Sequence, residues 1–154
     1  MRTIKFRAWN PYDKWIYGLI NWVSEEMNDV CMIVKDDKNQ TEHYFRGDLN
    51  TLGQFTGLHD KNGNEIYEGD NIILHQFLFD GGEYENQLIG QVIYDDNQAC
   101  YCLTNIKNEQ VQEYMGFKDD YTNFQKETVP IILFYGMHEE SFEVIGNIHE
   151  ADHA

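Results

Sequence analysis

The stretch GLHDKNGNEIYEGDNIIL, residues 57–74, decides the fold, because two tight turns and the start of a strand follow one another within it. The segment DKNG (60–63) predicts a type I turn that Gly63 closes in the left-handed region, joining two short strands. The segment YEGD (67–70) predicts a second corner before a central strand, where Gly69 accepts a φ that other residues resist. The residues interpreted as structural corners are Gly57, Asp60, Gly63, Gly69, Asp70 and Gly146.

A calcium loop is the first alternative for this stretch. Asp60, Asn62 and Asn64 match the first three ligand positions of an EF-hand loop. Position six is Glu65, where the bend needs glycine, and position twelve is Asn71, where the bidentate glutamate is missing. A catalytic carboxylate cluster is the second alternative, and it lacks a partner base and a desolvating pocket. The structural interpretation is therefore preferred, with no catalytic residue assigned.

The cysteines do not form a convincing metal site. Cys100 and Cys102 are two apart, so they share one face of a strand. A zinc site needs two more ligands, and neither Cys31 nor His75 is placed by the sequence to supply one. We interpret the pair as small buried hydrophobic residues, and we expect no metal and no cofactor.

Short alternating runs separated by turn signals predict a mainly β fold, as a barrel or a sandwich. NEQVQEYMGF (108–117) has the only helical pattern, and GDLNTLGQF (47–55) is interpreted as a connector with room for one helical turn. The predicted strands and hairpins are 3–23, 30–45, 54–58, 70–79, 89–104, 128–137 and 142–150.

The charge is strongly negative and unevenly distributed. The chain has 154 residues and a formal net charge of −16, yet residues 1–23 carry +3, which leaves −19 on the remainder. Such a surface repels phosphate backbones, so direct nucleic-acid binding is not expected. Solubility is the simpler explanation, and mimicry of nucleic acid is the alternative. Three cysteines, no apolar run near the roughly 20 residues of a membrane span and no signal-like N-terminus predict a cytoplasmic protein.

Three segments together resemble YopX-like proteins of bacteriophages and prophages. They are IKFRAW (4–9), FTGLHDKNGNEIYEGDNI (55–72) and EVIGNIHE (143–150), in the order and approximate spacing seen in that family. The resemblance implies an N-terminal β-hairpin lobe over residues 1–52 and an SH3-like, partly open β-barrel over residues 53–154. Residues 105–127 resemble an insertion in the barrel. The resemblance brings no catalytic residues with it.

Aromatic and basic residues gather near the N-terminus. Aromatic faces beside cationic groups form recognition surfaces for an anionic or flat ligand, or for a protein partner. The competing interpretation is that the tryptophans fill the core of the lobe, since large aromatic residues are usually buried. The candidate binding residues are Arg7, Trp9, Lys14, Trp15 and Tyr17.

The sequence therefore predicts a non-enzymatic accessory protein encoded by a phage or prophage in a host bacterium. It would bind a host or phage protein, or sequester a small anionic ligand. An acidic inhibitor that mimics nucleic acid and an enzyme of unrecognised type are the alternatives. A homo-oligomer is also expected, because the long apolar run 128–137 is a poor exposed edge and the two charge regions have opposite signs.

The corner at Gly69 provides the first testable prediction. The variant Gly69→Val should destabilise the fold by about 1 kcal/mol or more, because a β-branched side chain resists a positive φ. Thermal denaturation of the two proteins measures the effect. An unchanged melting temperature would contradict the interpretation of Gly69 as a corner.

Overall fold

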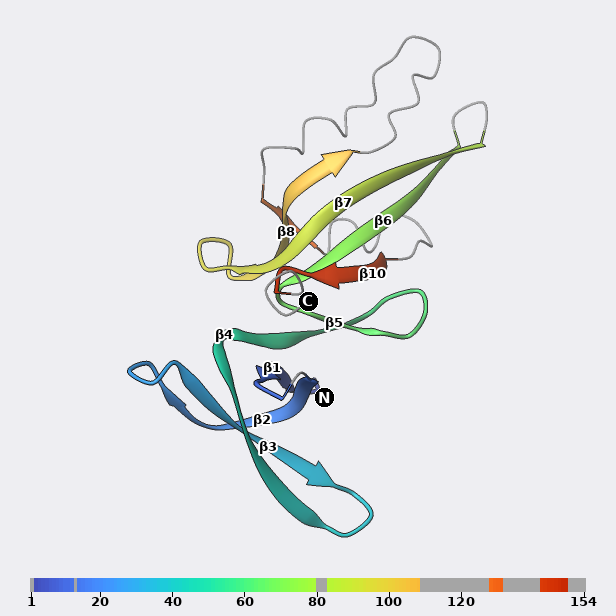
Figure 1. Ribbon diagram of the computed structural model, residues 1–154. Coiled ribbons are helices and arrows are strands. Elements are labelled where there is room, and N and C mark those ends of the chain that lie inside the picture. The colour runs from blue at the N-terminus through green and yellow to red at the C-terminus, as the bar shows by residue number, and fades with distance from the viewer. Residues whose placement is uncertain (1, 13, 80–82, 109–127, 132–141, 150–154) are drawn as a thin grey trace.

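The computed structural model describes residues 2–12, 14–79, 83–108, 128–131 and 142–149, and every element identified in them is a β-strand. The strands form two antiparallel sheets of five strands each (Figure 1). The mainly β class predicted from the sequence is confirmed. The predicted helix over 108–117 falls almost wholly outside the described residues.

The first sheet closes almost into a ring. Each strand is antiparallel to the next along the chain, and β1 also pairs with β4. Its small core consists of Ala8, Ile16, Val30 and Met32. The strands of this sheet are β1 (Phe6–Asn10), β2 (Lys14–Ser24), β3 (Asp29–Asp36), β4 (Thr41–His59) and β5 (Glu65–Tyr67).

Two small residues let β1 close the ring on β4. A Cβ on Gly47 would lie 2.7 Å from the Cβ of Ala8, so only glycine allows this close approach of the strands. The register slips between Arg7 and Trp9, and there the Trp9 N–H donates to the Thr51 hydroxyl at 2.8 Å. The hydroxyl therefore satisfies a partly buried backbone group that the irregular ladder leaves without its usual partner.

β4 corrects the expectation for residues 47–58. The sequence predicted a connector followed by a short strand at 54–58, but one strand of 19 residues runs from Thr41 to His59. It pairs in turn with β3, β1 and β5, so no single neighbouring strand sets its length. β4 also runs without interruption through the expected lobe boundary at residues 52 and 53.

The second sheet contains the larger core. Its strands lie in the order β10-β6-β7-β8-β9. Ten buried apolar side chains pack in its core, and one of them, Ile66, comes from β5 of the first sheet. Figure 1 accordingly shows β5 between the two sheets. The strands are β6 (Asp70–Phe79), β7 (Glu83–Asp95), β8 (Cys100–Asn108), β9 (Val129–Pro130) and β10 (Phe142–Asn147).

The strand expected over 128–137 is described only in its first residues. β9 has two residues and pairs only with β8, at the edge of the described sheet rather than at its centre. Val129 and Ile131 are nevertheless 5% exposed, because their side chains point into the core. Residues 132–137 lie outside the described part of the chain.

The turn at Asp60 ties the β4–β5 hairpin to the second sheet. Its Oδ1 accepts the N–H groups of Asn62 and Asn64, at 2.9 and 2.8 Å. Its Oδ2 accepts the Asn64 side-chain amide at 3.1 Å and the Val144 N–H of β10 at 3.1 Å. Gly63 has a φ of +82° and donates to the Asp60 carbonyl. The carboxylate is therefore engaged by hydrogen-bond donors from both sheets.

The corner at Gly69 has a different basis. Gly69 has a φ of +90°, and no atom lies closer than 3.7 Å to the position of an added Cβ. The penalty for a side chain there comes from backbone strain rather than from a clash. Gly57 has a similar φ of +88°, and Gly146 follows a register shift in β10.

The Asp60 carboxyl group should make the free energy of unfolding depend on pH. Burial alone would raise its pKa, but the N–H groups of Val144, Asn64 and Asn62 outweigh burial and hold the pKa below that of an ordinary aspartate. The folded state therefore gains stability above the unfolded pKa of about 3.9, and loses it as the pH falls through the lower folded pKa. We expect Asp60→Asn to cost about 2 kcal/mol near neutral pH, because two donors lose their acceptor.

Urea denaturation between about pH 6 and pH 3 measures the effect. The difference between wild type and Asp60→Asn should shrink toward the acidic end. The matched control is Asp37→Asn, whose residue is exposed in the β3–β4 turn. Both variants could lose the same unfolding free energy, or the difference between wild type and Asp60→Asn could be independent of pH. Either result would show that the Asp60 carboxylate does not stabilise the fold through its hydrogen bonds.

Candidate functional site

Arg7 lies between two aromatic rings at the junction of the sheets. Its guanidinium carbon is 4.5 Å from the ring centroid of Trp15 and 4.9 Å from that of Tyr67. Trp15 is on β2 and Tyr67 ends β5, so the stack joins distant segments. A cation between two aromatic faces is attracted to both, and more strongly where water is excluded.

The charge of Arg7 is neutralised by Asp70. Its Nη2 donates to Asp70 Oδ1 at 2.6 Å, and the two side chains are only 7% and 1% exposed. The second oxygen of Asp70 accepts the Tyr67 N–H at 2.8 Å. Within the described residues, Nε of Arg7 is buried without a hydrogen bond. The pair therefore leaves little of the arginine available to an external anion.

Further aromatic side chains extend this junction. Tyr17 lies 5.6 Å from Tyr67, and Trp9 packs edge-on against Trp15 at 5.3 Å between centroids. Burial raises the pKa of both Tyr17 and Tyr67, and the carboxylate of Glu65 raises them further. Both phenols therefore stay neutral near physiological pH and act as hydrogen-bonding aromatic surfaces rather than as bases.

Four of the five candidate binding residues share one face. Arg7 pairs with Tyr17 and Trp9 pairs with Trp15 across β1 and β2, so the side chains within each pair project in the same direction. Lys14 begins β2 on the opposite face, where its Nζ lies 5.4 Å from the ring of Phe45. The structure thus brings together the aromatic residues and Arg7, and separates Lys14 from them.

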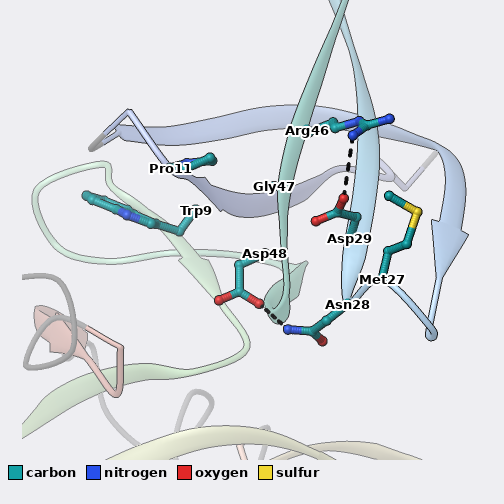
Figure 2. A pocket seen from close by; sticks show the side chains of 8 residues that line it. All are labelled: Trp9, Pro11, Met27, Asn28, Asp29, Arg46, Gly47 and Asp48. Atoms are coloured by element: carbon teal, nitrogen blue, oxygen red, sulfur yellow. Dashed lines mark hydrogen bonds and ion pairs between the residues drawn. The ribbon is translucent and has the colours of Figure 1, made fainter.

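A groove of about 590 Å³ opens beside this cluster. This volume lies in the range of small-ligand and side-chain pockets. In Figure 2, Trp9 and Pro11 lie on one side of β4 and Met27 lies on the other. The residues that line the groove are Trp9, Pro11, Met27, Asn28, Asp29, Arg46, Gly47 and Asp48.

The β2–β3 turn is fastened to β4 at the base of the groove. Asn28 takes a φ of +54°, which asparagine tolerates better than most residues. Its side-chain amide donates to Asp48 Oδ1 at 2.9 Å, and its carbonyl accepts the Leu49 N–H at 3.0 Å. These bonds fix the position of Met27, which projects from the same turn and is 56% exposed.

The groove carries a net negative charge. Asp29 and Asp48 provide two carboxylates, and Arg46 provides one positive charge. The ion pair between Arg46 and Asp29 is long, at 3.8 Å, and the arginine is 62% exposed, so it is weak. The donors to Asp48 reach Oδ1, and Figure 2 shows the other oxygen on the side of Trp9. This arrangement favours a cationic group beside an aromatic face.

Sequence reasoning found only Trp9 as a binding residue in this groove. Met27, Asp29, Arg46 and Asp48 were missed, because the pairing of β3 with β4 brings the last three together and the β2–β3 turn adds Met27. Arg46 alone gave a local signal, as an isolated base between acidic residues. Neighbouring strands, rather than neighbouring residues, therefore create the site.

Of the cysteine pair, Cys102 is buried as expected, whereas Cys100 is only partly buried. The two sulfur atoms of Cys100 and Cys102 are 3.7 Å apart, and Cys102 is fully buried. Burial and the neighbouring Cys100 raise the pKa of the Cys102 thiol to about 12, so it is not a ready nucleophile. In the described part of the chain, no three His, Cys, Asp or Glu side chains are grouped to hold a metal ion.

Comparison with known proteins places this fold in a family. The profile of the protein family described as YopX protein matches residues 5–153. The chain belongs to the YopX family. The resemblance inferred from the three sequence segments is thus confirmed across almost the whole chain.

Other comparisons add little to the YopX assignment. No curated protein matches this chain. A crystal structure of protein EF1440 from Enterococcus faecalis is similar to this YopX-family chain, with 20% identity and a TM-score of 0.41. The similarity covers 99% of this chain and 97% of that chain. Within its described residues, this YopX-family chain has no helix long and apolar enough to span a membrane.

The stability of this YopX-family chain should be especially sensitive to substitutions in the ion pair between Arg7 and Asp70. Arg7→Met should destabilise it by about 3–5 kcal/mol, because the buried Asp70 carboxylate is left without its counter-charge. The double variant Arg7→Met/Asp70→Asn should recover part of that loss, since the remaining buried charge is then removed. Denaturant unfolding of the single and double variants measures this coupling.

The matched control is Arg46→Met, which removes an exposed arginine from a long ion pair. Its effect on the free energy of unfolding should be small. If Arg7→Met costs no more than Arg46→Met, the buried pair does not hold the sheets together. If the double variant is as unstable as the two single variants combined, the charges do not interact.

Proposed function

We propose that the chain is a phage- or prophage-encoded, non-enzymatic accessory protein that binds a segment of another protein. The groove beside Trp9 is the proposed contact site. It combines apolar side chains on both sides of β4, Trp9 and Pro11 on one and Met27 on the other, with the carboxylates of Asp29 and Asp48. This combination is the single observation that carries the proposal, since interfaces are anchored by side chains that fill such pockets.

The charge of the groove defines the class of partner. A lysine or arginine side chain could lie over the Trp9 ring and approach the Asp48 carboxylate, while an adjacent apolar residue contacts Met27. The overall charge of −16 would also attract a basic protein from a distance. We therefore favour a basic segment of a host or phage protein over the small anionic ligand considered from the sequence.

The burial of Arg7 supports the same choice. An anionic ligand would need this guanidinium, and Asp70 already occupies it at 2.6 Å. Lys14, the other candidate cation, is on the opposite face of β2 over Phe45. The aromatic cluster around Arg7 instead supports the wall of the groove through the contact between Trp15 and Trp9.

Met27 provides a test that does not disturb the fold. It is exposed, so replacement by lysine or glutamate leaves the core intact. The full chain serves as bait in host lysate, and any captured protein is then purified for measurement of its affinity. We expect Met27→Lys to weaken binding by about tenfold or more and Met27→Glu to weaken it less, because both lose the apolar contact but only the lysine repels a basic partner.

Ile145→Lys is the matched control, because Ile145 is 48% exposed on β10, in the other sheet. It should bind like wild type. Equal affinities for Met27→Lys and Ile145→Lys would overturn the groove as the contact site. Capture that is unaffected by Met27→Lys but competed by duplex DNA would instead favour the alternative of nucleic-acid mimicry by the acidic part of the chain.

A further inference from the structure

A second surface, on the outer face of β2, β3 and β4, adjoins the groove at Arg46 and carries two exposed apolar side chains with a partly exposed one between them. Leu19 pairs with Ile33, and Ile33 pairs with Tyr44, so the three residues lie side by side across the sheet. Leu19 is 42% exposed and Tyr44 is 58% exposed. We call these three residues the apolar row.

The next row along the strands extends this surface. Trp22 pairs with Cys31, and Cys31 pairs with Arg46. The guanidinium of Arg46 lies 5.5 Å from the ring of Trp22, which is itself 37% exposed. Neighbouring exposed large apolar residues of this kind typically mark an interaction site.

Residues of opposite charge flank Tyr44, one on each side of it along β4. Side chains alternate along a strand, so Glu42, Tyr44 and Arg46 of β4 all project from the same face. The hydrogen bond from the Tyr44 hydroxyl to Glu42 agrees with this placement. An acidic and a basic group thus lie two residues to either side of Tyr44.

We propose that this face binds a second copy of the chain about a two-fold axis. The axis would lie in the plane of contact, across the strands at the level of Tyr44. The apolar row of each copy then meets the same row of the other, and Glu42 of each copy lies opposite Arg46 of the other. A two-fold contact of this type is self-complementary, which is the pattern that most soluble homodimers use.

The distribution of charge favours contact through this part of the chain. Residues 1–52 hold seven Lys and Arg against eight Asp and Glu, a net charge of −1. The remaining −15 falls on residues 53–154. Two copies that meet through β2–β4 bring nearly neutral surfaces together, whereas contact through the rest of the chain would oppose strongly acidic surfaces.

Charge reversal tests both the contact and its geometry. Sedimentation velocity of the full chain, near physiological salt and up to about 100 µM, should give twice the monomer mass of 18.2 kDa. Glu42→Arg alone and Arg46→Glu alone should each weaken association by about tenfold or more, because like charges then face one another. An equimolar mixture of the two variants should dimerise again, since every facing pair is then of opposite sign.

The mixture distinguishes a facing pair from a merely structural effect, because a fold damaged by one substitution would not recover on mixing. Ile145→Lys, an exposed change in the other sheet, is the control and should dimerise like wild type. A monomer at every concentration, dimerisation that neither reversal weakens, or a mixture that stays monomeric would each overturn the proposal. The groove is tested separately through Met27, whose readout is affinity for another protein rather than mass.

Discussion

The ion pair between Arg7 and Asp70 is the constraint on which the arrangement of the two sheets depends. Its members are 63 residues apart, on β1 and β6, and each sheet has its own core. Burying two charges is costly, and the Nε of Arg7, which has no hydrogen bond to any described residue, adds to that cost. The short contact and the flanking rings of Trp15 and Tyr67 offset it, and they fix where one sheet meets the other.

The turns could be predicted from the sequence because their signals are local. Gly63 and Gly69 have positive φ values, and the Asp60 carboxylate accepts hydrogen bonds from N–H groups no more than four residues away. β4 could not be predicted in the same way. Its 19 residues are held by three different partner strands, and the glycine that permits ring closure does so through contact with Ala8. Such pairings depend on segments that the sequence pattern does not connect.

The same limit applies to the candidate site. The sequence correctly placed Arg7 among aromatic residues, since strand alternation puts Trp15 and Tyr17 beside it. It could not show that Asp70 would arrive from another sheet and occupy the guanidinium. The guanidinium that the sequence offered to a ligand is therefore buried and paired within the fold. The acidic groove and the apolar row were missed for the complementary reason, because both are assembled across strands by register.

The net negative charge lies in one part of the chain, and the groove and the apolar row lie in another. The nearly neutral residues 1–52 contain all the residues that line the groove and the whole apolar row, while residues 53–154 carry a net charge of −15. An acidic surface keeps other acidic molecules at a distance and draws basic ones closer, but it forms few specific contacts. Contacts that depend on shape are better made where repulsion is weak. The buried ion pair joins β1 in the first region to β6 in the second, so a change at Arg7 would disturb the arrangement of both regions.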